Sequence, residues 1–142
     1  MIGLDTNVLA RYYVEDKQDV EAERQRVAAR RLIESGRPLM VCKTVILELD
    51  WVMRGYYGFA PAEVLRVLRH LIAIPHVTIE DRGAVEHALS QADAGFDMAD
   101  ALHHASYRAC ASVASFDDRR FARRAKRMGL SPPVIVPTVR HR

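Results

Sequence analysis

Acidic side chains stand where short, strand-like runs of this sequence end. Asp5 follows the apolar residues 2–4, and Asp117 follows the strand-like stretch 112–116. The carboxyl ends of parallel strands meet at one edge of an α/β sheet, and ligands bind at that edge. We therefore expect both carboxylates to lie there. Helix capping is the alternative interpretation, since Asp is a favoured N-cap residue and each of the two precedes a helix-like pattern.

Three further acids have positions that suit chemistry. Asp97 and Asp100 are three residues apart at the start of an expected helix, so they share one face of its first turn. Capping and the helix dipole would also favour acids there. Glu48 has apolar neighbours on both sides in the sequence, which predicts a place within or beside a buried stripe, while Asp50 can face outward at the helix margin. A buried carboxylate is costly unless it is paired or bound to a cation.

The acids favour one shared explanation. Ser, Asn or Thr would cap helices as well, yet this chain uses Asp at each such point. Carboxylates that gather repel one another, and a divalent cation removes the repulsion. Ligation by oxygen alone, with retained water, is typical of Mg²⁺ or Mn²⁺. The convergence of Asp100 with the other acids does not follow from spacing alone.

Short strand-like runs alternate with helix-like patterns along the chain. Strands are expected near residues 2–4, 39–42, 77–79, 112–116 and 134–136, and helices near 6–14, 19–34, 44–54, 61–72, 82–93, 97–110 and 118–128. This order predicts an α/β fold with a mainly parallel central sheet of about five short strands and helices on both faces. At 142 residues and 49% hydrophobic, we expect a single domain, 1–142, whose last few residues form a frayed tail.

The charge balance permits a phosphate-rich partner. The net charge is +3 and the pI is about 9.1. Candidates for contacting a nucleic-acid backbone are Arg119, Arg120, Arg123 and Arg124, although a solvated helix face is the commoner meaning of such a run. No apolar run reaches transmembrane length, and Asp5 interrupts the start before a signal-peptide core. We therefore expect no membrane contact and a cytoplasmic location.

Four short motifs carry the most specific information in the sequence. They are Ile2-Gly3-Leu4-Asp5-Thr6-Asn7-Val8-Leu9, Leu47-Glu48-Leu49, Phe96-Asp97-Met98-Ala99-Asp100-Ala101-Leu102 and Ser115-Phe116-Asp117. In combination they resemble the PIN-domain ribonucleases, and among these the VapC-type toxins of bacterial toxin–antitoxin modules. The resemblance covers essentially the whole chain. One departure is Cys42-Lys43, where the family often has Ser after the second strand.

The resemblance implies a metal-dependent endoribonuclease that is the toxin of a type II module. The family's quartet of acids, which holds the metal, is matched by Asp5, Glu48, Asp100 and Asp117. By this match, Asp5, Asp100 and Asp117 would bind Mg²⁺ or Mn²⁺, and Glu48 would bind it or accept a proton from water. Supporting positions are matched by Thr6, Asn7, Asp97 and Ser115.

The resemblance also implies partners. These are an RNA substrate, a VapB-type antitoxin and a second copy of the chain in a homodimer. An antitoxin segment would lie in an apolar groove beside the first two helices. Candidate residues for lining it are Val27, Trp51, Val52, Tyr56, Tyr57 and Phe59, for which core packing is the alternative.

Three other functions compete with this reading. A phosphotransfer domain of similar form commonly has a second acid close to the first, but Asn7 stands two residues after Asp5. A catalytically idle binding module on the same fold is a second alternative. A PIN-fold nuclease that processes RNA without an antitoxin is the third. Histidine-based cleavage is disfavoured, because His103 and His104 lie about one turn beyond Asp100, where they could at most line the RNA path.

Overall fold

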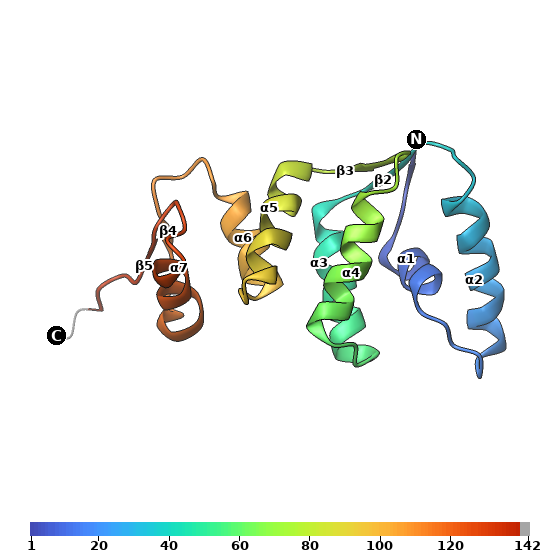
Figure 1. The fold of residues 1–142 in the computed structure, drawn as a ribbon, viewed down its shortest axis with the longest axis horizontal. Coiled ribbons are helices and arrows are strands. Elements are labelled where there is room, and N and C mark those ends of the chain that lie inside the picture. The colour runs from blue at the N-terminus through green and yellow to red at the C-terminus, as the bar shows by residue number, and fades with distance from the viewer. Residues whose placement is uncertain (140–142) are drawn as a thin grey trace. The chain divides into compact units, whose positions relative to one another are not determined.

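A computed structural model describes residues 1–139 of the chain (Figure 1). Its first elements are β1 (Ile2–Gly3), α1 (Thr6–Tyr13), α2 (Val20–Ile33), β2 (Leu39–Val41), α3 (Lys43–Trp51), the π-helical turn η1 (Val52–Tyr56), α4 (Pro61–Ile72) and β3 (Val77–Ile79). The remaining elements are α5 (Arg82–Asp93), α6 (Met98–Ser106), β4 (Val113–Ala114), the π-helical turn η2 (Asp118–Ala122), α7 (Arg123–Arg127) and β5 (Val134–Ile135). Among residues 1–139, every helix is too short or too polar to span a lipid bilayer.

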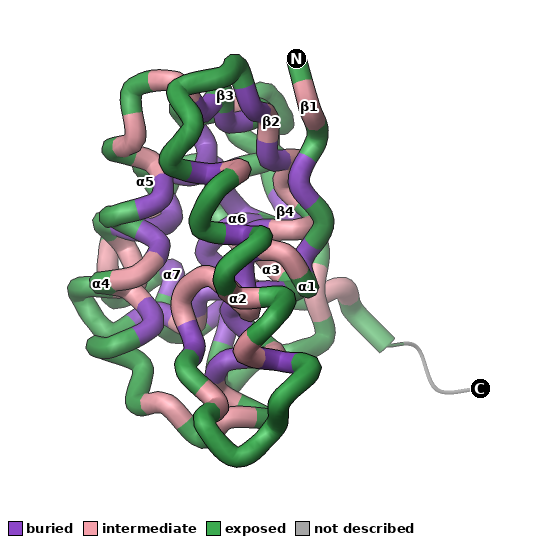
Figure 2. Tube along the Cα trace, turned by 90° about the vertical axis from the view of Figure 1, so that its right-hand side faces the viewer, coloured by how far each residue is buried: buried purple, intermediate pink, exposed green. Residues whose placement is uncertain are grey.

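Strands β1, β2 and β3 form a parallel sheet with β2 in the middle. Ile2 is opposite Leu39, which is in turn opposite Val77. Parallel strands need crossover connections. Helices α1 and α2 supply the first crossover, and α3 and α4 supply the second. The carboxyl ends of β1 and β2 are therefore neighbours, and α1 and α3 begin there. Both ends of β2 are fully buried, as expected for the central strand of a covered sheet (Figure 2).

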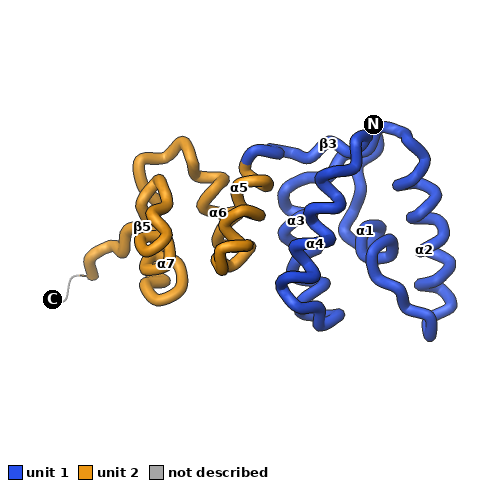
Figure 3. Tube along the Cα trace, viewed as in Figure 1, with its two compact units in different colours: residues 1–83 blue, residues 84–142 orange. Residues whose placement is uncertain are grey.

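The chain divides into two compact units, residues 1–83 and 84–142 (Figure 3). In the second unit, β4 pairs in parallel with β5, and Val113 is opposite Val134. The α/β class with parallel strands is confirmed. The described strands, however, lie in a sheet of three and a sheet of two, whereas the sequence predicts one sheet. Periodicity identifies a strand, but contacts distant in sequence choose its partner. Part of the expected frayed tail, residues 140–142, lies outside the described residues.

Helix starts follow the expected capping chemistry. The Asp19 carboxylate accepts a hydrogen bond from the Ala22 amide at 3.1 Å at the start of α2. At the start of α4, Pro61 takes the first position and the Glu63 carboxylate accepts from the Ala60 amide at 3.0 Å. Gly95, whose φ of +100° suits glycine, follows α5 and turns the chain toward the next helix start. That helix, α6, carries two candidate acids.

Two helices end earlier than the sequence predicts. Helix α3 ends at Trp51 and continues as the turn η1, and α6 ends at Ser106, ahead of the expected Cys110. At the end of α6, the Ser106 hydroxyl donates to the Leu102 carbonyl at 2.7 Å, and Arg108 Nη1 donates to the Ala105 carbonyl at 3.0 Å. Side-chain donors thus add to the backbone hydrogen bonds at the carboxyl end of this helix.

Candidate active site

Asp5 caps helix α1 at the carboxyl end of β1. Its Oδ1 accepts a hydrogen bond from the Thr6 amide at 2.8 Å, and its side chain is exposed. The capping interpretation is therefore confirmed. Capping is compatible with metal binding, because only one carboxylate oxygen of Asp5, Oδ1, accepts the capping hydrogen bond. The neighbouring Thr6 is buried, and its Oγ1 has no hydrogen-bond partner within residues 1–139. A buried hydroxyl without a hydrogen-bond partner is costly. The Thr6 hydroxyl beside Asp5 therefore fits a site in which a bound cation and its waters would supply the partner. Asn7 is exposed.

The buried acid of α3 is Asp50, whereas Glu48 is exposed, so the prediction for this pair is wrong. Apolar residues that repeat at three- and four-residue spacing put Ile46, Leu49, Asp50 and Met53 on the covered face. Glu48 lies about 200° around the helix from Ile46. The Asp50 carboxylate accepts bonds from Arg54 Nη2 at 2.7 Å and Nε at 3.1 Å. This bidentate pair satisfies the buried charge, and Glu48 stays accessible to a ligand.

The acids of the second unit lie within electrostatic reach of one another. Burial raises the pKa of the Asp100 carboxyl above its ordinary value, and the charges of Asp97 and Asp117 raise it further. His103 and Arg120 act in the opposite direction. The predicted fourth acid and the supporting Asp97 thus each lie within electrostatic reach of the third acid, Asp100. His103 was not predicted to act on Asp100, although its spacing of three residues on the same helix was the available signal.

Local hydrogen bonds hold two of these acids in place. Asp97 is the N-cap of α6, and its Oδ2 accepts from the Asp100 amide at 3.2 Å. Asp117 Oδ1 accepts from the Arg120 amide at 3.0 Å at the start of η2. The Asp117 amide donates to Ser115 Oγ at 3.0 Å. Each Asp is therefore a cap as well as a candidate ligand, and Ser115 positions the backbone of the fourth acid.

The four candidate arginines differ in what they contact. Arg123 pairs with Asp118, with Nη2 and Nε at 3.0 and 3.1 Å from Oδ2. Arg124 Nη1 donates to the Gly95 carbonyl at 3.2 Å. Arg119 is exposed, and Arg120 lies close enough to Asp100 to affect its pKa. Arg119 and Arg120 are therefore the better candidates for a phosphate contact, since the other two side chains already have partners.

His104 is a core residue, which corrects its expected place along an RNA path. It is 1% exposed, and its Nε2 donates to the Pro132 carbonyl at 2.7 Å. Its ring packs edge-on against Phe121 at a centroid distance of 6.3 Å. His103, the next residue back, is exposed. Two adjacent helical residues point about 100° apart, so one enters the core and the other faces solvent.

The chemistry of these donors fits a divalent cation. The candidates are hard carboxylate and hydroxyl oxygens, the ligands that Mg²⁺ and Mn²⁺ prefer. Burial and the charges of Asp97 and Asp117 raise the pKa of the Asp100 carboxyl, so a cation beside Asp100 would favour its charged form. Within residues 1–139, no group of three or more His, Cys, Asp and Glu side chains is arranged to hold a metal ion. The metal set Asp5, Asp100 and Asp117 therefore stays a prediction.

The chain matches the PIN domain family over residues 2–127. Since the match covers most of the sequence, this chain belongs to the PIN domain family. PIN domains are generally nucleases, they typically use divalent metals, and they bind RNA. The resemblance of the four motifs to the PIN domain family is thus confirmed. The narrower assignment to the VapC-type toxins stays a prediction. No curated protein sequence matches the chain.

Proposed function

We propose that this protein is a metal-dependent endoribonuclease, acting in the cytoplasm as the toxin of a type II toxin–antitoxin system. The observation that carries the proposal is the position of Asp100 in a PIN-family chain: it is partly buried, and the charges of Asp97 and Asp117 act on it. Carboxylates in electrostatic reach of one another destabilise the charged state of each. A bound Mg²⁺ or Mn²⁺ ion would offset this cost. Metal-dependent cleavage of RNA would explain why the chain keeps these acids close to one another.

The proposed roles follow from the surroundings of each residue. Asp5, Asp100 and Asp117 would hold the cation. When bound, a divalent cation stabilises charge on a phosphate and lowers the pKa of an attacking water. Glu48 is exposed, so it can share the cation or accept a proton from that water. Arg119 and Arg120 would bind phosphate oxygens, contacts that position RNA without reading its sequence.

A cleavage assay on total RNA tests the nuclease proposal. RNA would be incubated with the protein in Mg²⁺, in Mn²⁺ and in EDTA, and the cut sites would be mapped by sequencing. Hydrolysis by water expels the 3′-oxygen, so products should carry a 5′-phosphate and a 3′-hydroxyl. They should then ligate to a 3′ adaptor without phosphatase treatment, and EDTA should stop their formation.

The same assay separates this chemistry from histidine-based cleavage. A metal-free ribonuclease uses the ribose 2′-hydroxyl as nucleophile and leaves a cyclic phosphate. His103→Ala should retain most activity, whereas Asp5→Ala should not. His104 is left unchanged in this comparison, because removing a buried ring would create a cavity. Cyclic phosphate ends that form in EDTA would contradict the proposed mechanism.

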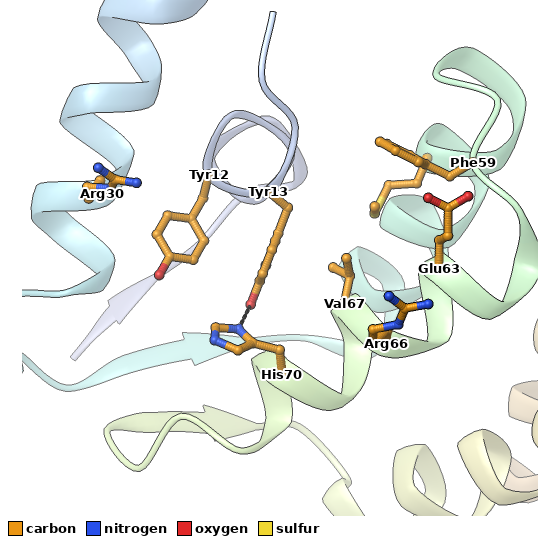
Figure 4. Close-up of a pocket in the computed structure, with 9 residues that line it drawn as sticks. Tyr12, Tyr13, Arg30, Phe59, Glu63, Arg66, Val67 and His70 are labelled. Carbon is orange, nitrogen blue, oxygen red and sulfur yellow. Dashed lines mark hydrogen bonds between the residues drawn. The ribbon is translucent and has the colours of Figure 1, made fainter.

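A pocket in the first unit supports the proposed antitoxin partner. It has a volume of about 500 Å³ and is lined by Tyr12, Tyr13, Arg30, Met53, Phe59, Glu63, Arg66, Val67 and His70 (Figure 4). The Tyr13 hydroxyl lies 2.7 Å from His70 Nδ1. Of the predicted groove residues, Phe59 lines this pocket, and Trp51 and Tyr56 are exposed. Apolar and aromatic walls with a few polar groups are typical of a site that takes an inserted side chain.

Co-expression with the neighbouring small gene tests the partner. The antitoxin should co-purify and inhibit cleavage, and Phe59→Ala should weaken the complex, because the ring forms part of the pocket wall. We also propose that the toxin forms a homodimer, which light scattering would detect. A chain that cuts RNA as a monomer and is indifferent to the neighbouring product would instead be an RNA-processing nuclease.

A further inference from the structure

Phe116 is an exposed aromatic residue that the proposed roles leave unexplained. Its side chain is 70% exposed. The second unit buries its other phenylalanines, Phe96 and Phe121, whose rings lie 5.8 Å apart in the core. Leaving a phenyl ring in water forgoes the stabilisation that burial would bring. Phe116 therefore contributes little to the described core. Contact with a ligand would explain why an aromatic side chain stands at this exposed position.

The backbone that carries this ring is held on both sides. The Ser115 amide donates to the Ile135 carbonyl at 2.9 Å, which continues the pairing of β4 with β5. The Phe116 carbonyl accepts from the Asp118 amide at 3.0 Å. The intervening Asp117 amide is bound by Ser115 Oγ. A ring presented from a fixed backbone loses little conformational freedom when it binds a flat partner.

In the sequence, Phe116 stands next to the candidate acids and cations. Asp117 is the next residue, and its charge acts on Asp100. Arg119 and Arg120 follow within four residues, both exposed. An aromatic surface beside cationic groups is the combination that binds single-stranded nucleic acid, because bases stack on the ring while phosphates meet the charges. The net charge of +3 is compatible with such a partner.

We propose that Phe116 is a stacking platform for one unpaired base next to the scissile phosphate of a single-stranded RNA. The inference rests on the proposed nuclease function and adds to it a residue that positions the substrate. Bases in a duplex are already stacked on their neighbours, whereas bases in single strands and loops can turn outward onto an aromatic side chain. Phe116 is thus a positioning residue that places the backbone relative to the acids, and it should tolerate any base.

Abasic substrates test the proposal. A single-stranded oligonucleotide with one mapped cut site would be made intact and with an abasic residue at each position around the cut. For the wild-type protein, kcat/KM should fall at one position by about 5- to 150-fold, the effect of losing one stacked base. Phe116→Ala should lose as much on intact RNA and nothing further at that abasic position. Phe116→Trp should retain the wild-type pattern.

Two further variants separate stacking from other roles. Phe116→Leu keeps an apolar side chain but has no aromatic face, so it should behave like Phe116→Ala; a Leu variant equal to wild type would overturn the proposal. Tyr107→Ala is the matched control, because Tyr107 is also an exposed aromatic of this unit, at 51%, and follows α6. It should leave the abasic pattern unchanged.

A binding readout keeps the test independent of catalysis. In an Asp100→Asn background, 2-aminopurine at the sensitive position should be quenched on binding, and Phe116→Ala should remove the quenching. Wild-type protein that cuts RNA but loses nothing at any abasic position would overturn this inference alone. Protein that neither binds nor cuts any RNA would overturn the proposed function and this inference with it.

Discussion

Asp100 shows how several functions can depend on one carboxylate. It lies in the first turn of α6, where its partial burial raises the pKa of its carboxyl and the charges of Asp97 and Asp117 raise it further. Its ionised form is therefore disfavoured in the folded protein without a cation. Replacing it with a neutral isostere should relieve that repulsion and remove a metal ligand. Relief of the repulsion should stabilise the folded protein without metal, whereas loss of the ligand should lower RNA cleavage. The substitution therefore separates a structural role of Asp100 from a catalytic one.

Asp100→Asn should reduce RNA cleavage by more than about 100-fold, since even second-shell changes at metal sites cost about 10- to 100-fold. The variant should melt in EDTA at the wild-type temperature or slightly above it, with an unchanged circular dichroism spectrum. Asp93→Asn, an exposed acid at the end of α5, is the control and should keep wild-type activity. Wild-type cleavage by Asp100→Asn would refute the assignment of the third acid.

Tyr13 supplies a prediction about pH. Burial raises the pKa of its phenol above the ordinary value of about 10, and Tyr12 raises it further. Above pH about 10 the unfolded chain loses this proton while the folded chain keeps it, so the unfolded state gains stability. The contribution of Tyr13 is thus complete below pH about 10 and is lost as pH rises toward its folded pKa. Melting temperatures measured from pH about 8 to 11 should fall less for Tyr13→Phe than for wild type.

At the scale of the element, α3 and η1 are organised by a buried ion pair. Asp50 has a side-chain exposure of 4%, and its partner Arg54, one turn later, has 34%. The pair spans the point where the α-helix passes into the π-helical turn. The bidentate bond therefore links the last turn of α3 to η1. The exposed Glu48 on the opposite face is then free of this structural role.

Arg54→Met should destabilise the protein by about 1–3 kcal/mol, because it leaves a buried carboxylate without its cation, partly screened by solvent. Arg54→Met with Asp50→Asn should recover part of the loss. Glu48→Gln is the control on the same helix and should change the free energy of unfolding by less than about 0.5 kcal/mol, while lowering cleavage. Urea denaturation measures all three. Equal destabilisation by Glu48→Gln would contradict the assignment of the buried acid.

At the scale of the whole molecule, the family match runs through both compact units, from residue 2 to 127. We therefore keep the prediction that residues 1–142 form a single domain, which a single cooperative unfolding transition would support. Family membership also predicts that the folded chain, and not the unfolded one, binds a divalent metal. Ligand binding of that kind stabilises the native state by mass action.

Mg²⁺ or Mn²⁺ should raise the melting temperature, with a stabilisation of about 2.7 kcal/mol at a hundredfold excess over the dissociation constant. Asp5→Ala and Asp100→Asn should each reduce this shift, whereas Asp93→Asn should not. Differential scanning calorimetry in a metal titration measures the effect. A melting curve that stays unchanged up to millimolar metal would argue against the proposed cofactor.

Local patterns in the sequence determined most of the elements of this protein. The bounds of α1, α2, α4 and α5 agree with the expected helices, and Asp5 is the N-cap that one interpretation of the sequence predicted. The four motifs lie within the region, residues 2–127, that matches the PIN domain family. These features depend on residues within about four positions of one another, through helical hydrogen bonds, capping and apolar periodicity. A linear sequence displays such relations directly.

Tertiary structure decided the features that depend on contacts distant in sequence. Asp50 is buried in place of Glu48 because the covered face of α3 is chosen by what packs against it. His104 can enter the core because its ring nitrogen donates a hydrogen bond to the Pro132 carbonyl, 28 residues later in the sequence. The five strands form two sheets, and Asp117 affects Asp100 from another element. Apolar periodicity shows which residues can be buried and which segments can form strands. Which residue is buried, and which strands pair, depends on the free energy of contacts with partners that only folding brings close.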